Sequence, residues 1–169
     1  MKPLREPGRF RIKQAALEEL PLAARVKAAA WRESYPFEDG VFQAQDELAD
    51  QAALGWEQAA RRGGYFWVVV DTQQDGDIVG LAHAQVSDDP AAPTPLELSM
   101  IYLLDRAKGS GIADRLMEMT IEDAPAFLWV LEGNDRAIAF YERHGFRADG
   151  TTQELTGLLA GHRERRMVR

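Results

Sequence analysis

The sequence predicts an α/β fold, with one domain over residues 1–169 built around a mixed sheet. Three observations support this prediction. Runs of β-forming residues alternate with segments rich in Ala, Leu and Glu, as in layered α/β domains. Two of the β-forming runs are joined by a short polar turn, which predicts a hairpin. A third run, Leu96–Leu104, passes through a turn with glycines directly into a helix-forming segment.

The first half of the chain predicts two helices between a first strand and the hairpin. Pro21 marks the start of the first helix, because proline fits the first helical turn. Gly63 and Gly64 end the second helix, and Gly80, inside a β-forming run, indicates a bulge. The elements expected here are a strand over Arg9–Lys13, helices over Leu17–Trp31 and Val41–Arg62, and hairpin strands over Tyr65–Asp71 and Asp77–Val86.

The second half predicts two strand–helix pairs followed by C-terminal strands. Three prolines within Asp88–Pro95 indicate a surface loop, and Gly145 ends the last helix. The elements expected are strands over Leu96–Leu104 and Ala126–Leu131, helices over Gly111–Ile121 and Asp135–Arg143, and one or two strands after Gly150, the last over Arg163–Val168. The predicted order is therefore β-α-α-β-β-β-α-β-α-β-β, and this order indicates a layered α/β domain.

Composition excludes several classes of protein. The formal charge of −7 and the pI near 5.0 argue against nucleic-acid binding, which depends on clustered Lys and Arg. Without cysteine the chain has no disulfide, no thiolate nucleophile and no cysteine-based zinc site. No apolar run approaches the roughly 18 residues of a membrane span. We expect a cytoplasmic protein that binds no nucleic acid, membrane or metal.

The junction between the strand and the helix predicts a phosphate-binding loop. A strand–turn–helix junction directs backbone N–H groups and the positive end of a helix dipole at one point. Gly109 and Gly111 allow a diphosphate to approach the backbone closely, and Lys108 is expected to add a mobile cation at the edge. Two nucleotide-binding patterns fit poorly. Gly111 is not followed by Lys and Ser or Thr, and Asp114 stands where the dinucleotide pattern needs Gly or Ala.

The loop resembles motif A of the GNAT superfamily of acetyl-CoA-dependent N-acetyltransferases, which reads Gln/Arg-x-x-Gly-x-Gly/Ala. Here the motif is Lys108-Gly109-Ser110-Gly111-Ile112-Ala113, and Lys at its first position is a departure from the pattern. A second block, Leu128–Phe146, is similar to the family's other signature: a strand, an Asn, a short helix that ends in Tyr, and Gly-Phe. One helix and one strand separate the two blocks, as in the family.

The resemblance implies the GNAT fold, a mixed and mostly antiparallel central sheet flanked by helices. It also implies acetyl-CoA as the cofactor, and acetyl transfer to a primary amine by direct attack in a ternary complex. In this family the Asn, here Asn134, contacts the cofactor or the adjoining backbone, and the Tyr, here Tyr141, lies against the thioester sulfur. The implied cofactor-binding residues are Ile101, Tyr102, Leu103, Lys108, Gly109, Ser110, Gly111, Ile112, Ala113, Asn134 and Tyr141.

Two side chains are predicted to transfer protons. Tyr141, a phenol with a pKa of about 10, can protonate a leaving thiolate with a pKa of about 8.5. Glu97 lies eleven positions before Lys108, as catalytic glutamates do in some members of the family, and can deprotonate the amine directly or through water. Backbone N–H groups around Ile101–Leu103 can polarise the thioester carbonyl. Structural alternatives stay open: Tyr141 as a packing residue, Asn134 as a helix cap, Glu97 as a solvated carboxylate and Lys108 as a surface lysine.

The segment between the first two helices is expected to line the acceptor site, with Trp31, Glu33 and Tyr35 as substrate-binding candidates. Aromatic walls with nearby carboxylates suit an amine, although the aromatic residues equally suit a core. The acceptor is a small-molecule or peptide amine. His83 and His144 are expected to pack and to interact with a helix end, respectively. The competing hypothesis is a non-catalytic acyl-CoA-binding module, and an open sheet edge would permit a homodimer.

Overall fold

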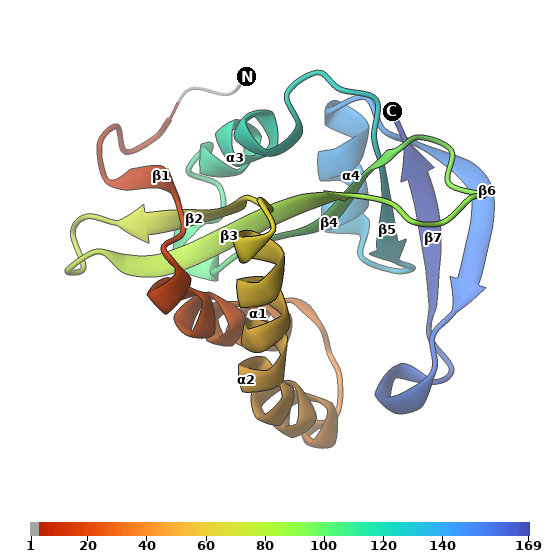
Figure 1. Cartoon of the computed structure of the whole chain (residues 1–169), viewed down its shortest axis with the longest axis horizontal. Helices are drawn as coiled ribbons and strands as arrows, with labels where there is room; N and C mark the ends of the chain where they lie inside the picture. Colours follow the sequence, from red (N-terminus) through yellow and green to blue (C-terminus); the bar gives the residue numbers. More distant parts are fainter. Residues whose placement is uncertain (1–3) are drawn as a thin grey trace. The chain divides into compact units, whose positions relative to one another are not determined.

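A computed structural model describes residues 4–169 and contains the predicted strands and helices in the predicted order (Figure 1). The strands are β1 (Phe10–Gln14), β2 (Phe66–Asp71), β3 (Asp77–Val86), β4 (Leu96–Leu103), β5 (Phe127–Leu131), β6 (Arg147–Glu154) and β7 (Arg163–Val168). The helices are α1 (Leu20–Ser34), α2 (Asp39–Arg61), α3 (Ile112–Ile121) and α4 (Asp135–Arg143). Three 3₁₀ segments are present: η1 (Leu17–Glu19), η2 (Asp105–Ala107) and η3 (Gly157–Leu159). η1 occupies the start of the helix expected over Leu17–Trp31, whereas η2 and η3 were not predicted, because one turn carries no readable periodicity.

The strands form a sheet in the order β1-β2-β3-β4-β5-β7-β6. β4 and β5 run parallel, with Glu97 opposite Phe127, whereas β1–β2, β2–β3, β5–β7 and β6–β7 are antiparallel. A parallel pair requires a crossover connection, and α3 lies in the connection between β4 and β5. The sheet is therefore mixed and mostly antiparallel, which confirms the predicted fold class.

The chain forms two compact units. The first contains the chain up to Ala84 together with Met100–Glu122, and the second contains Gln85–Ser99 and Asp123–Arg169. The glycine loop and the first two helices belong to the first unit. Glu97, Asn134 and Tyr141 belong to the second unit.

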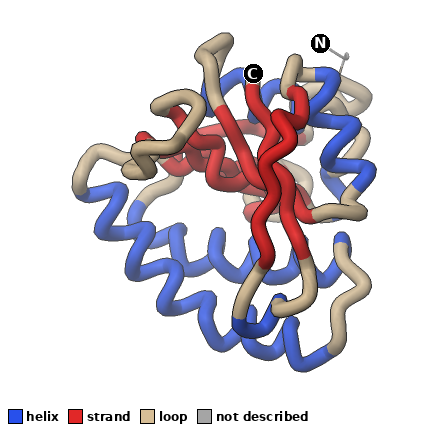
Figure 2. The backbone as a smooth tube through the Cα atoms, turned by 90° about the vertical axis from the view of Figure 1, so that its right-hand side faces the viewer, coloured by secondary structure: helices blue, strands red, loops and turns tan. Residues whose placement is uncertain are grey.

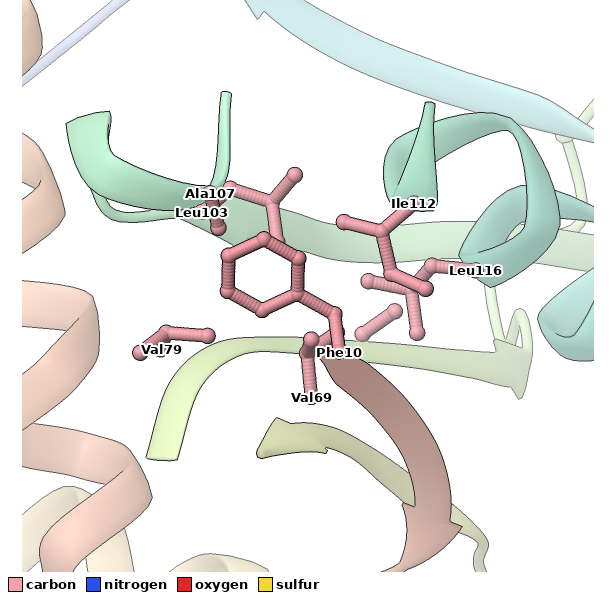
Figure 3. Close-up of a cluster of buried hydrophobic side chains, with 8 residues drawn as sticks. Phe10, Val69, Val79, Leu103, Ala107, Ile112 and Leu116 are labelled. Carbon is pink, nitrogen blue, oxygen red and sulfur yellow. The ribbon is translucent and has the colours of Figure 1, made fainter. Parts of the chain in front are cut away.

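In the first unit, helices cover both faces of the strands (Figure 1). Figure 3 shows the cluster beneath α3, formed by Phe10, Val69, Val79, Ala82, Leu103, Ala107, Ile112 and Leu116. A second cluster beneath α1 contains Ala23, Val26, Val68, Ile78 and Leu81. α2 packs on α1 through Ala24, Ala49 and Ala53, whose small side chains let the helices approach closely. Each large apolar side chain buried in this way contributes about 1.5–3 kcal/mol.

The β2–β3 hairpin carries the predicted bulge. Val69 pairs with Gly80 and Val70 with Ile78, so β3 has one extra residue, Val79. A Cβ at position 80 would lie 2.2 Å from a leucine side chain of β4 and 2.8 Å from a backbone oxygen. Glycine at this position therefore brings β4, the strand that leads into the glycine loop, close to β3.

In the second unit, β5, β7 and β6 form an antiparallel ladder, and Figure 2 shows β6 and β7 as adjacent red strands. β6 begins at Arg147, before the expected start of the C-terminal strands. This early start is hard to predict because almost every β6 side chain is exposed, so the strand has no alternation of buried and exposed residues. A register shift between Ala148 and Thr152, with Gly150 at φ +88°, further interrupts the pattern.

Candidate functional site

The glycine loop lies in the first unit between η2 and α3. Gly109 and Gly111 both have a left-handed backbone, with φ of +79° and +89°. A side chain would be strained at either position, because L-residues disfavour this region. α3 then begins at Ile112 and buries Ile112, Leu116 and Met117. The geometry thus has the strand–turn–helix form that the sequence predicts.

Ser110 holds the loop in shape, a role that the sequence analysis did not assign. Its side chain is buried, and its Oγ donates to the Ala107 carbonyl at 2.7 Å. The same Oγ accepts from the Ile112 N–H at 3.3 Å, and the Ser110 carbonyl accepts from the Arg5 N–H at 3.0 Å. A serine between two glycines just before a helix is the signal that could have indicated this role.

Other backbone amides of the loop lack an acceptor within the part of the chain that the structure describes. In residues 4–169, no described hydrogen bond uses the N–H of Gly109, Gly111 or Ala113, and the N-cap of α3 is Gly111, which has no side chain to cap the helix. A Cβ at Gly109 would meet no atom within 4 Å. Uncapped N–H groups at a helix start, with free space beside the backbone, suit a diphosphate. The loop therefore fits the phosphate-bearing cofactor that the sequence predicts.

The part of β4 within the first unit alternates as expected. Ile101 and Leu103 belong to the cluster beneath α3, whereas Met100 and Tyr102 belong to the cluster beneath α1. The backbone of this stretch is thus held from both faces. Its predicted role, polarising the thioester carbonyl, stays a prediction.

Lys108 differs from the expected mobile cation. Its Nζ lies 2.7 Å from Asp105 Oδ1 and 3.1 Å from Ser34 Oγ, and the side chain is only 16% exposed. The first position of the motif is therefore attached to the end of α1. The reason is the 3₁₀ turn η2, which places Asp105 three residues before Lys108 on the same side.

The predicted acceptor residues gather at the end of α1. Trp31 and Tyr35 form an aromatic cluster with Phe37, with ring centroids 5.1–5.8 Å apart. The Trp31 indole nitrogen is buried and has no hydrogen-bond partner in the part of the chain that the structure describes. Lys27 lies one turn earlier, with its Nζ 5.9 Å from the Trp31 ring centroid, and burial lowers the pKa of this ammonium. Glu33, by contrast, contacts the backbone near the glycine loop: its Oε2 accepts from the Asp105 N–H at 2.6 Å.

In the second unit, Asn134 and Tyr141 lie at the two ends of α4. Asn134 is the N-cap, and its Oδ1 accepts from the Ala137 N–H at 3.1 Å. Asn134 therefore caps the helix. A cap does not exclude the predicted contact with the cofactor, which stays a prediction. Tyr141 is half-buried, with its ring edge-on to Phe140 and Phe146 at centroid distances of 5.6 and 6.0 Å.

Glu97 lies in the part of β4 that belongs to the second unit. Its Oε2 accepts from Gln85 Nε2 at 3.0 Å, so a neutral amide orients the carboxylate without an ion pair from that side chain. A carboxylate oriented by a neutral donor keeps lone pairs for accepting a proton. This geometry is compatible with the predicted base.

The histidines behave as the sequence predicts. His83 is buried, stacks on Phe66 at 3.9 Å, and its Nδ1 lies 2.8 Å from the Tyr65 carbonyl. His144 is the C-cap residue of α4.

Among residues 4–169, no group of three or more His, Cys, Asp or Glu side chains is placed to hold a metal ion. Within the same residues, no helix is both long and apolar enough to span a bilayer.

Comparison with known proteins identifies the family. The family model for the acetyltransferase (GNAT) family matches residues 26–146, which include the glycine loop and the Asn134–Tyr141 block. The chain belongs to the GNAT family. The resemblance inferred from the two motifs is thereby confirmed, and this GNAT protein is an acetyltransferase.

Relatives carry the corresponding names. The chain is 25% identical over 175 residues to "Probable N-acetyltransferase Rv2775" of Mycobacterium tuberculosis, with 97% of each protein covered. It is 34% identical over 102 residues to an "Uncharacterized N-acetyltransferase" of Mycobacterium bovis, covering 57% of this chain and 61% of that protein.

Solved structures share the fold. One is yncA of Salmonella typhimurium, solved with its cofactor acetyl-CoA, with a TM-score of 0.70, 13% identity, and 96% of this chain and 94% of that chain covered. Another is a phosphinothricin acetyltransferase of Sinorhizobium meliloti in complex with AcCoA, with a TM-score of 0.66, 18% identity, and 95% and 88% covered. These similarities confirm the predicted GNAT fold.

Proposed function

We propose that this protein transfers the acetyl group of acetyl-CoA to a primary amine, by direct attack in a ternary complex within a single domain. The observation that carries the proposal is the glycine loop at the start of α3, where the N–H groups of Gly109, Gly111 and Ala113 have no acceptor among the described hydrogen bonds of residues 4–169. Family membership supports acetyl transfer, and two structural neighbours hold acetyl-CoA or AcCoA. The chain contains no cysteine to carry a covalent acetyl group, which favours direct attack over a thiol-linked acyl-enzyme.

The loop would bind the diphosphate of the cofactor. The N–H groups of Gly109, Gly111 and Ala113 are the donors, and Ser110 maintains the turn that directs them. Lys108 lies directly before Gly109 and connects the head of the loop to α1. Ile112 is the first residue of α3. Bound acetyl-CoA supplies an activated acetyl thioester, and backbone N–H groups of Ile101–Leu103 would polarise its carbonyl.

Two side chains of the second unit would handle the protons. Glu97, oriented by Gln85, takes a proton from the attacking amine directly or through water. Tyr141 donates its phenolic proton to the departing thiolate, and Asn134 supports the same helix from its other end. The cap and the packing of Tyr141 against Phe146 support this assignment, because both restrict where the phenol can lie.

The acceptor would lie along the segment from Trp31 to Tyr35. The aromatic cluster there provides flat apolar walls, and Trp31 has a buried N–H without a partner among residues 4–169. This combination suits an amine on an apolar or aromatic body, either a small molecule or a peptide. A cytoplasmic location and a homodimer stay predictions.

Ligand-dependent melting and turnover test the proposal. Acetyl-CoA and CoA are expected to raise the melting temperature, whereas ATP and NAD are not, because only ligands bound by the folded state stabilise it. Thiol release from acetyl-CoA should then depend on added amine. Tyr141→Phe should reduce kcat about 100-fold without changing CoA affinity, and Tyr65→Phe, at a 59% exposed tyrosine, is the matched control. If CoA stabilises the protein but no added amine accelerates thiol release from acetyl-CoA, the result would contradict acetyl transfer to the amines tested.

A further inference from the structure

The end of α1 contacts the turn that leads into the glycine loop. β4 ends at Leu103, and the 3₁₀ turn η2 begins at Asp105. The Asp105 N–H at the start of this turn donates to Glu33 Oε2 at 2.6 Å. Glu33 belongs to the last turn of α1, 72 residues away in the chain. A long-range contact to a carboxylate therefore fixes where the turn begins.

The same end of α1 makes a second contact with the loop. Ser34, next to Glu33, lies 3.1 Å from the Nζ of Lys108, and Asp105 Oδ1 lies 2.7 Å from the same Nζ. Lys108 is the residue directly before Gly109, so the ammonium group connects the head of the loop to α1. Asp105 takes part in both contacts, through its N–H with Glu33 and through its carboxylate with Lys108.

The far side of the loop is held separately. The Ser110 carbonyl accepts from the Arg5 N–H at 3.0 Å, and Ala107 is completely buried beneath α3. The loop is thus attached at its head through side chains of α1 and at its tail through backbone and core. The attachment at the head depends on polar side chains of α1, so a substitution at Glu33 removes one of its two contacts and leaves the Ser34–Lys108 contact in place.

We infer that Glu33 is a positioning residue for cofactor binding: its carboxylate holds the Asp105 N–H and so presets the loop that carries the donors to the diphosphate. This inference rests on the proposed function, because it takes the glycine loop as the cofactor site. It gives Glu33, which the sequence placed on the acceptor side, a role toward the cofactor. Charge-assisted hydrogen bonds of this length are among the strong ones, and preset donors reduce the ordering cost of binding.

The arrangement also links two parts of the active site. Trp31 and Tyr35, the predicted acceptor walls, flank Glu33 and Ser34 on the same stretch of chain. A displacement of the loop on cofactor binding would therefore act on the segment that would line the acceptor site, through the contacts of Glu33 and Ser34. Because coupling between two ligands is reciprocal, the acceptor should then bind with a different affinity when CoA is present.

Direct binding of CoA, measured by titration calorimetry, tests the inference. Glu33→Ala should raise the Kd for CoA about tenfold, because it removes one charge-assisted hydrogen bond that shapes the loop. Glu33→Gln should stay within about threefold, because its amide oxygen still accepts from the Asp105 N–H. Glu33→Leu, which keeps the bulk of the side chain, should resemble Glu33→Ala, and it supplies the same test if the alanine variant is poorly folded.

The matched control is Arg32→Met, at the neighbouring position. Arg32 forms an exposed ion pair with Asp46 of α2 at 2.9 Å and contacts no loop residue among its described partners. Its substitution should leave the Kd for CoA unchanged, with melting temperatures confirming that each variant is folded. Unchanged CoA binding in Glu33→Ala and Glu33→Leu, or an increase confined to the KM for the amine, would overturn the inference. Failure of the unsubstituted protein to bind CoA would instead contradict the proposed function.

Discussion

The helices α3 and α4 begin in opposite ways, although each follows a left-handed glycine turn. Gly111 precedes α3 with φ +89°, and Gly133 lies before α4 with φ +87°. At α4 the Asn134 side chain caps the helix by accepting from the Ala137 N–H. At α3 the N-cap is Gly111, which has no side chain, and the Ser110 Oγ accepts only from the Ile112 N–H at 3.3 Å. The N–H groups of Gly109, Gly111 and Ala113 have no acceptor among the hydrogen bonds of the described residues. A glycine N-cap forgoes about a few tenths of a kcal/mol relative to a capping side chain, and we interpret the N–H groups that it leaves without acceptors as the mark of a ligand site.

The sharpest test of this comparison substitutes one glycine in each turn. Gly109 and Gly133 both have positive φ, and a Cβ at either would meet no atom within 4 Å. Alanine should therefore cost each turn a similar backbone strain of about 1–2 kcal/mol. Only Gly109→Ala places a methyl group where a diphosphate would approach the backbone. We expect it to raise the Kd for CoA about 100-fold, because several charged hydrogen bonds are weakened together.

Gly133→Ala is the matched control for this substitution. It should lower the melting temperature as Gly109→Ala does, while CoA affinity stays within about twofold of the unsubstituted protein. Titration calorimetry and thermal unfolding on both variants separate the two effects. Equal losses of CoA affinity in the two variants would break the comparison, because the turn before α4 would then matter as much as the loop.

Polar groups whose partners all lie inside the chain should affect stability alone, and Asp71 at the end of β2 is the strongest case. Its carboxylate is completely buried, accepts from Arg9 Nη2 at 2.9 Å, and accepts from the Gln73 N–H at 3.1 Å. Asp71→Asn should reduce the free energy of unfolding by about 2 kcal/mol, because a hydrogen bond to a charged group is lost within the core. Asp50→Asn, at a 75% exposed partner of Arg25, should change it by less than about 0.5 kcal/mol.

The pH dependence of unfolding gives a second measurement on Asp71. Hydrogen bonding to the Arg9 guanidinium holds the pKa of Asp71 below its ordinary value. The folded state therefore binds this proton less readily than the unfolded state does. The stabilisation is complete above about pH 4, the ordinary range for aspartate, and is lost as the pH falls toward the depressed pKa. Denaturant unfolding should be measured on the unsubstituted protein and on Asp71→Asn. The difference between their free energies of unfolding should shrink below about pH 4, and a difference that does not change with pH would contradict the ion pair.

Asn134 allows the cap and the cofactor contact to be separated at α4. Asn134→Ala should reduce the free energy of unfolding by about 1 kcal/mol, and Asn134→Asp should retain it, because aspartate caps a helix equally well. If capping is the only role of Asn134, Asn134→Asp should bind CoA as tightly as the unsubstituted protein does. Any loss of CoA affinity in Asn134→Ala should then be no larger than its loss of stability explains. A selective loss of CoA affinity in Asn134→Asp, measured by calorimetry, would show that the amide donor itself contacts the cofactor.

The sequence predicted the elements better than the contacts that shape the site. β3, α4 and β7 have the predicted bounds because turn signals delimit them. The early start of β6 was missed because exposed strands carry no periodicity. Motif spacing likewise located the loop. It could not reveal that Lys108 is bound by Ser34 and Asp105, or that Glu33 contacts a backbone N–H 72 residues away, since such contacts depend on how distant segments pack.

The smallest expected effect on stability concerns Lys27. Like the two helix starts, the ammonium groups of Lys27 and Lys108 differ in the partners that the chain provides. Lys108 has an anionic partner, whereas within residues 4–169 no ion pair is described for the half-buried Lys27. Burial lowers the pKa of Lys27, so the unfolded state binds this proton more readily and stability rises with pH toward the ordinary lysine range. Lys27→Met keeps the apolar stem and removes the charge, and it should raise the free energy of unfolding at pH 7 by about 1 kcal/mol. This gain should shrink as the pH approaches 10, and CoA affinity should not change. A lower stability of Lys27→Met at pH 7 would mean that the contact of the ammonium with the Trp31 ring outweighs the cost of its burial.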